Sequence, residues 1–160
     1  MDLAEEVVIE APRDDVYARL NDVDVLRKCI PGCEELERND DGDLEARVTL
    51  KIGPVKARFT GVVHLDPSGA PEHFTLSGQG NGGAAGFAKG GADVTLTEEE
   101  PGTTVLAYTA HVEIGGKLAQ LGSRLVASTA KKLSAKFFAC FAETFEAKEG
   151  EEPATEAKTA

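Results

Sequence analysis

The spacing of apolar residues divides the chain into a short helical region, a long alternating region and a final helix. Five segments alternate apolar and polar side chains, and this period of two is typical of β-strands with one buried face. Turn-forming pairs such as Asp41-Gly42 and Pro101-Gly102 separate the segments, so the pattern predicts an antiparallel meander. The five segments are residues 44–53, 56–65, 73–77, 92–98 and 104–114.

Helices are predicted on both sides of this meander. A first strand, residues 3–11, precedes short helical patterns in residues 13–22 and 23–29, which stop at Ile30-Pro31-Gly32. Residues 116–146 repeat apolar side chains at helical spacing over about 45 Å of helix. This segment is the only candidate long enough to cover the apolar face of the sheet. The sequence therefore predicts an α+β fold in which a curved antiparallel sheet wraps around a long C-terminal helix.

The chain is predicted to form one folded domain and a polar tail. It has 160 residues, of which 41% are apolar, enough for one substantial core. We place the domain at residues 1–147 and a disordered acidic tail at residues 148–160, where apolar residues become scarce. No apolar run reaches 18 residues, and the first residues carry acids where a signal peptide carries basic residues. The expected location is therefore the cytoplasm.

Charge is distributed unevenly along the chain. The formal net charge is −11, yet residues 115–145 hold five basic residues and one acid. An acidic body repels phosphates, so general nucleic-acid binding is not expected. Within the basic segment, Lys117, Arg124 and Lys131 recur every seven residues on one helix face. Two interpretations stay open: a solvated face that pairs with nearby acids, or a surface that docks an anionic protein or phospholipid partner.

A glycine-rich stretch, residues 77–91, has two possible structural roles. Gly78, Gly80 and Gly83 match the G-x-G-x-x-G spacing of a dinucleotide-binding turn, but such a turn must lead into a helix. A strand pattern follows here, so a phosphate site is not predicted. Gly61, Gly78 and Gly80 fall on the inward face of the sheet, where missing side chains leave volume. The glycines either serve curvature alone or also help to form an apolar ligand cavity.

An apolar cavity between the long helix and the sheet is the predicted binding site. Its expected lining consists of large inward-facing side chains, and the Pro31-Gly32 turn is expected near its mouth. Tyr108 can bond the polar end of a ligand through its hydroxyl, although such a tyrosine is more often a core residue. The nine predicted lining residues are Leu50, Phe59, Phe74, Leu76, Phe87, Tyr108, Leu125, Phe137 and Phe141.

Catalytic and metal-binding patterns are weak. Cys29 and Cys33 form a CxxxC pair without a second pair, so buried thiols in a reducing compartment are expected rather than zinc ligation or a disulfide framework. The three histidines lie in separate strands, without a partnered serine, cysteine or aspartate pattern. We therefore expect no catalytic residue, no metal and no resident cofactor. The alternatives are an enzyme with a proton-transfer group in the cavity, or a structural adaptor without a ligand.

Four blocks of sequence resemble one known family. They are IPGCEEL at residues 30–36, IGPVKARFTG at 52–61, GFAKGGADVTL at 86–96 and GGKLAQLGSRLV at 115–126. In this order they are similar to the G subunit of carbon monoxide dehydrogenase. Its family belongs to the helix-grip superfamily, with its START-like and birch-pollen-allergen-like (Bet v 1-like) domains. The resemblance covers roughly residues 2–145 and implies a helix-grip fold with two short helices after the first strand.

The resemblance also implies a function. Members of this family are associated with attaching a molybdenum hydroxylase of the carbon monoxide dehydrogenase type to the cytoplasmic membrane, where electrons pass to quinone. The implied role is a non-catalytic accessory protein, with a quinone or lipid as the ligand and peripheral contact with the inner face of the membrane. Some relatives have a longer apolar C-terminal extension. The segment GEEPATEAKTA stands in its place here, so we expect a soluble carrier or adaptor rather than independent anchoring.

Overall fold

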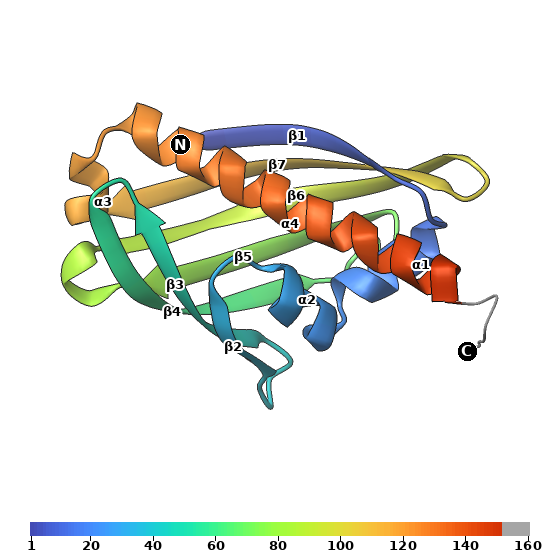
Figure 1. Cartoon of the computed structure of the whole chain (residues 1–160), viewed down its shortest axis with the longest axis horizontal. Helices are drawn as coiled ribbons and strands as arrows, with labels where there is room; N and C mark the ends of the chain where they lie inside the picture. The colour runs from blue at the N-terminus through green and yellow to red at the C-terminus, as the bar shows by residue number, and fades with distance from the viewer. Residues whose placement is uncertain (152–160) are drawn as a thin grey trace.

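A seven-stranded antiparallel sheet forms the body of the protein (Figure 1). The computed structural model describes residues 1–151, with side chains through Glu146. Strands β2 to β7 lie in sequence order, and β1 pairs with β7. The strands are β1 (Asp2–Ile9), β2 (Cys33–Arg38), β3 (Leu44–Ile52), β4 (Val55–Asp66), β5 (His73–Asn81), β6 (Phe87–Glu100) and β7 (Thr103–Gly115).

Helices connect β1 to β2 and follow β7. Figure 1 shows the last helix running along one face of the sheet, with the two short helices near its C-terminal end. Asp22 caps the second helix, because its carboxylate accepts hydrogen bonds from the backbone N–H groups of Asp24 and Val25. The predicted α+β helix-grip fold is confirmed. The helices are α1 (Arg13–Leu20), α2 (Val23–Cys29), α3 (Lys117–Gln120) and α4 (Ser123–Glu151), with a single 3-10 turn η1 (Gly83–Ala85).

Several elements differ from the sequence-based prediction. β2 has no counterpart in that prediction, and β5 and β6 extend into the glycine-rich stretch. The expected continuous helix is two helices, because Gly122 adopts a φ of 93° that ends α3 and begins a new axis. α4 continues to Glu151, past the predicted domain boundary at residue 147. Residues 152–160 of the predicted tail lie outside the described residues.

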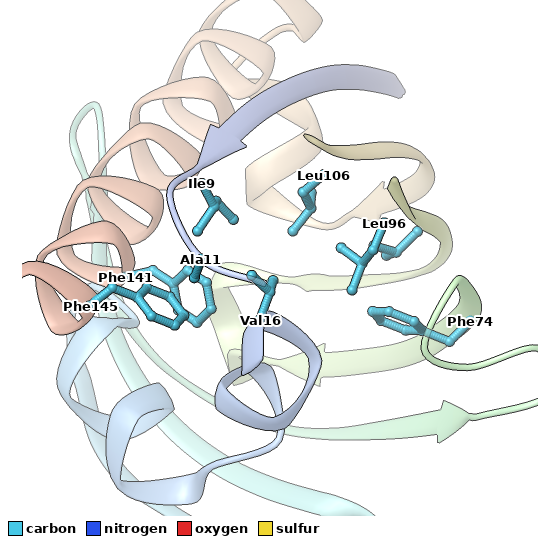
Figure 2. Close-up of a cluster of buried hydrophobic side chains, with 9 residues drawn as sticks. Ile9, Ala11, Val16, Phe74, Leu96, Leu106, Phe141 and Phe145 are labelled. Atoms are coloured by element: carbon cyan, nitrogen blue, oxygen red, sulfur yellow. The ribbon is translucent and has the colours of Figure 1, made fainter. Parts of the chain in front are cut away.

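Packed apolar side chains fill one end of the molecule (Figure 2). They come from the second half of α4, from α1 and from the strands nearest to it. The rings of Phe137 and Phe141 lie 5.7 Å apart and those of Phe141 and Phe145 lie 5.3 Å apart, so aromatic contacts follow α4 along this end. The buried members of this core are Ile9, Ala11, Val16, Phe74, Val94, Leu96, Leu106, Phe141 and Phe145.

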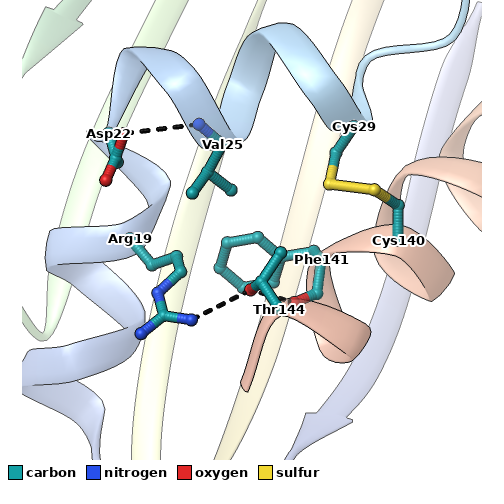
Figure 3. Close-up of a disulfide and its surroundings, with 7 residues drawn as sticks. All are labelled: Arg19, Asp22, Val25, Cys29, Cys140, Phe141 and Thr144. Carbon is teal, nitrogen blue, oxygen red and sulfur yellow. Dashed lines mark hydrogen bonds between the residues drawn. A yellow bond between two sulfur atoms is a disulfide. The ribbon is translucent and has the colours of Figure 1, made fainter. Parts of the chain in front are cut away.

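A disulfide between Cys29 and Cys140 joins α2 to α4 (Figure 3). Beside it, Arg19 of α1 donates a 3.1 Å hydrogen bond to Thr144 of α4, and its guanidinium lies 4.1 Å from the ring centre of Phe145. The prediction of a buried thiol is therefore wrong for Cys29, whereas Cys33 is a free thiol. The reason for the error is that the end of α2 folds onto α4, a contact that cysteine spacing along the chain does not reveal.

Candidate functional site

The other end of the molecule is hollow. A cavity of about 600 Å³ lies between the inner face of the sheet and the first half of α4, a volume in the range of pockets that hold drug-sized molecules. Alternating residues of β3 to β7 supply most of its wall, and almost all of the inward-facing residues are apolar. Outside the sheet, the wall includes Ile30, Pro31, Leu118, Val126, Thr129, Ala130 and Leu133.

Several inward-facing positions of the sheet around this cavity are glycines and carry no side chain. At Gly90 an added Cβ would overlap the carbonyl oxygen of His111, and at Gly61 it would lie 2.9 Å from the carbonyl oxygen of Gln79. Neighbouring strands therefore approach closely where the sheet bends. At Gly80 the nearest atom would lie 4.0 Å away, so the missing side chain leaves open space. The glycines thus contribute to both curvature and cavity volume.

The structure brings three of the nine predicted lining residues into the cavity wall, namely Leu50, Phe59 and Leu76. Four others belong to the packed end, because inward-facing positions on the same strands and helix extend past the cavity into the core. Phe74 and Phe141 are core members, and Tyr108 and Phe137 pack against that core.

The remaining two predicted lining residues lie at the rim of the hollow end. Phe87 is 43% exposed, and its ring covers Gly115 on the outer face of β7. Leu125 packs against Gly53 in the turn between β3 and β4. The prediction favoured large side chains, whereas the wall owes its shape to small ones such as Ala130.

A cluster of three polar side chains lies between β1, β7 and α4. The hydroxyl of Tyr108 donates to Glu5 Oε1 at 2.9 Å, and the hydroxyl of Ser134 donates to the same oxygen at 2.9 Å. Burial raises the pKa of Tyr108, so its hydroxyl keeps its proton at neutral pH. The sequence analysis missed Glu5, although the alternation of β1 places this acid on the inward face with Leu3 and Val7.

Exposed basic and acidic side chains are concentrated at opposite ends of the molecule. Five exposed cations lie at the hollow end, and none makes an ion pair with a described side chain. Acids also lie at this end: Asp2, Glu34, which pairs with Arg58, and Glu113, which stands opposite Lys89 in the β6–β7 register. The five cations are Lys51, Lys56, Lys89, Lys117 and Arg124. At the packed end, exposed acids gather at the strand ends and on α1: Glu10, Asp14, Asp15, Glu72, Glu99 and Glu100.

The predicted basic face is divided by the break before α4. Lys117, Arg124 and Lys131 are all exposed, but Lys117 lies on α3 and the other two lie on α4. Their seven-residue spacing therefore does not follow one helix axis. Lys117 and Arg124 belong to the hollow end, and Lys131 lies two turns further along α4.

Other candidate chemistry is confined to the surface. Within the described residues, no cluster of three or more histidine, cysteine, aspartate or glutamate side chains could hold a metal ion. In the same part of the chain, no helix combines the length and the apolar character needed to cross a membrane. Each histidine pairs with an aspartate on the exposed outer face: His64 with Asp43, His73 with Asp93 and His111 with Asp2.

Comparison with known families identifies the chain. The sequence model of the G subunit of carbon monoxide dehydrogenase (CoxG) matches residues 6–146, which include the whole sheet except the start of β1. The chain belongs to the CoxG family. No curated protein sequence matches it.

Solved structures show the same fold. A conserved protein from Geobacillus kaustophilus superposes with a TM-score of 0.86 at 28% identity, covering 92% of this chain and 97% of that one. The Zhui aromatase/cyclase from a Streptomyces species gives 0.70 at 13% identity, covering 96% and 98%. A START superfamily protein from Mycobacterium smegmatis gives 0.62 at 19% identity, covering 90% and 98%. The last two likenesses show the fold alone, so this CoxG family member has a START-like helix-grip fold.

Proposed function

We propose that this CoxG family member binds an apolar ligand, a quinone or a lipid, in the cavity beneath α4. The observation that carries the proposal is a volume of about 600 Å³ with an almost wholly apolar wall. An apolar ligand would remove this surface from water, which contributes about 25 cal/mol for each Å² buried. The family match supports a role beside a molybdenum hydroxylase of the carbon monoxide dehydrogenase type.

The proposed role is non-catalytic. Among the described residues, no aspartate, glutamate, histidine, cysteine or tyrosine contributes to the cavity wall. Lys89 carries the one charged side chain among the described wall residues, and it lies on the exposed face of β6. Proton transfer within the wall therefore has no inward-facing acid or base, and the nearest carboxylate, Glu5, lies one row beyond the wall. The polar residues of the wall include Thr129, whose hydroxyl already donates to the carbonyl oxygen of Leu125. This composition favours binding over chemistry at the cavity surface.

The proposed docking surface is the hollow end with its cations. Lys117 and Arg124 have no ion-pair partner among the described residues, so they are available to an acidic protein surface or an anionic headgroup layer. Each basic residue near an anionic membrane contributes about 1 kcal/mol. We propose that the protein is cytoplasmic and meets its enzyme, and the inner face of the membrane, through this end. The cavity would then face the source of its ligand.

Native mass spectrometry of protein purified gently from its own cells, followed by solvent extraction, tests the ligand proposal. We expect a mass increment that disappears on extraction and an isoprenoid quinone or lipid in the extract. Protein found without ligand, yet bound to the molybdenum hydroxylase, would contradict the carrier role and leave an adaptor.

A further inference from the structure

Inward-facing side chains of β1, β7, β6 and β5 form rows that run across the sheet. One row belongs to the cavity wall: Leu3, Ala110, Ala92 and Leu76. The next row toward the packed end is Glu5, Tyr108, Val94 and Phe74. The last two residues of this second row are core members, and none of its four residues belongs to the cavity wall. The row therefore lies directly beyond the wall at the packed end, and we call it the floor.

The floor is polar on one side only. Phe74 and Val94 make its β5–β6 side apolar, whereas Glu5 and Tyr108 make its β1–β7 side polar. Ser134 completes this side from α4. It follows the wall residue Leu133 and precedes the aromatic residues that pack against the core. The three polar residues are each half-buried, and each adjoins a wall residue: Glu5 adjoins Leu3, Tyr108 adjoins Ala110, and Ser134 adjoins Leu133.

In the polar cluster the two hydroxyl groups can donate hydrogen bonds and the carboxylate of Glu5 accepts them. Glu5 Oε1 lies 2.9 Å from the hydroxyl of Tyr108 and 2.9 Å from that of Ser134, and both hydroxyls can donate to it. The two hydroxyl oxygens also lie 3.0 Å apart, so one hydroxyl can donate to the other instead. The raised pKa of Tyr108 keeps its proton on the hydroxyl oxygen. The hydrogen bonds to Glu5 within residues 1–146 involve Oε1, which leaves Oε2 free to accept. In either arrangement both hydroxyl protons are engaged within the cluster, and lone pairs remain on its oxygens.

We propose that Glu5, Tyr108 and Ser134 form a recognition site for a hydroxyl group of the cavity ligand. The ligand class is an alcohol, a phenol or a hydroquinone with an apolar remainder. Its O–H group donates to the free carboxylate oxygen of Glu5, while the remainder occupies the apolar cavity. This inference rests on the proposed function, because it names the chemical group that the same cavity selects.

The site discriminates between a hydroxyl and a carbonyl at the same position. A carbonyl oxygen can only accept hydrogen bonds, and both protons of the cluster are already engaged within it. A carbonyl ligand therefore gains a hydrogen bond only if a hydroxyl gives one up, which disfavours it by about tenfold or more. The reduced, hydroxyl-bearing form of a quinone is accordingly the form that the floor retains.

A paired titration tests this preference. The probes are a decyl-substituted benzohydroquinone and the corresponding benzoquinone, titrated without oxygen into the full chain by calorimetry. We expect the hydroquinone to bind about tenfold more tightly. In Glu5→Gln the side-chain amide supplies a donor where the wild type has only acceptors, so the preference should fall at least threefold or reverse. Glu6→Gln alters the adjacent, outward-facing residue and should leave the preference unchanged.

Uptake of diphenylhexatriene, a hydrocarbon without hydrogen-bonding groups, reports whether the cavity is intact. Equal affinity for the two ring compounds in the wild type, with normal uptake of the hydrocarbon, would overturn the recognition site alone. An unchanged preference in Glu5→Gln would do the same. A wild-type protein that takes up neither the hydrocarbon nor either ring compound would overturn the proposed ligand binding itself. If Glu5→Gln does not fold, Ser134→Ala replaces it, with a weaker loss of preference expected.

Discussion

Cys29 at the end of α2 is bonded to Cys140 in α4, which lies 111 positions further along the chain. Ile30 and Pro31, the two residues that follow Cys29, form part of the cavity wall. The covalent bond therefore ties one edge of the cavity to the helix that roofs it. Among the described residues, no other segment that borders the cavity is joined to α4 by a disulfide.

Reduction of this disulfide should destabilise the protein. A cross-link that closes a loop of this length restricts the unfolded chain, and loss of a native disulfide typically costs about 2–5 kcal/mol. We expect a lower urea midpoint with dithiothreitol than without it, and the same decrease in the double variant Cys29→Ser, Cys140→Ser. Cys33→Ser is the control, because this cysteine is a free thiol. Equal midpoints in oxidised and reduced protein would contradict the expectation.

Gly80 and Gly90 border the same cavity but should respond oppositely to substitution. At Gly80 an added side chain meets no atom closer than 4.0 Å, so Gly80→Leu should fill the cavity and leave folding intact. At Gly90 even a methyl group overlaps the backbone of β7, so Gly90→Ala should cost about 1–3 kcal/mol or more. Thermal unfolding and uptake of diphenylhexatriene measure both effects. Normal uptake by Gly80→Leu would mean that the ligand space lies elsewhere.

Phenylalanines at the two ends of the molecule should contribute unequally to stability. Phe141 is completely buried at the packed end, so Phe141→Ala should lower the free energy of unfolding by about 3–5 kcal/mol. Phe59 borders the cavity, where fewer atoms surround the ring, and Phe59→Ala should cost less. Urea denaturation of the two variants gives the comparison. A larger loss at Phe59 would show that the hollow end is packed.

Charge reversal tests the docking surface. The triple variant Lys117→Glu, Arg124→Glu, Lys131→Glu should abolish co-sedimentation with vesicles containing anionic phospholipid, or with the molybdenum hydroxylase, because attraction becomes repulsion. Glu99→Lys together with Glu100→Lys changes the charge at the packed end and serves as the control. Binding by the triple variant at the wild-type level would remove this surface from the proposal. Unfolding curves of all variants show whether the fold is retained.

Glu98 should contribute to stability in a pH-dependent manner. Its carboxylate accepts backbone hydrogen bonds from Arg13, at the start of α1, and from Gly102, in the turn after β6. These bonds lower the pKa of Glu98 in the folded protein. The contribution is therefore present above the ordinary glutamate pKa and is lost as the pH falls through the lowered folded value. Glu98→Gln should flatten the acid side of the curve of unfolding temperature against pH, whereas Glu99→Gln should not.

The strands were predictable because their side chains alternate so regularly. In β3, Val48, Leu50 and Ile52 face inward while Thr49 and Lys51 face outward, and no other periodicity fits these residues. Helical spacing of apolar residues likewise predicted the long helix, and strand alternation predicted the inward-facing glycines. Local patterns of this kind depend only on neighbours in the chain, so they can be read without the fold.

Other features depend on contacts between distant segments, and the sequence does not show them. The partnership of Cys29 with Cys140 requires α2 to fold onto α4. The cavity ends where an inward-facing row of the sheet meets the aromatic residues of α4. The sequence does not show which row this is, and Tyr108 and Phe141 were therefore assigned to the cavity although both pack with the core. The break at Gly122 was hidden because the residues around it continue an apolar spacing that suits one helix.

The separation of acids and cations between the two ends makes this protein an electric dipole. An object of this kind rotates in the field of an anionic surface before it touches that surface, and its positive end leads. Orientation of this sort raises the rate of productive encounters at low ionic strength, while salt at 0.15 M confines the field to about 8 Å. The cavity lies behind the positive end, so in the proposed approach to an anionic surface the arrangement of charge would bring the cavity end first.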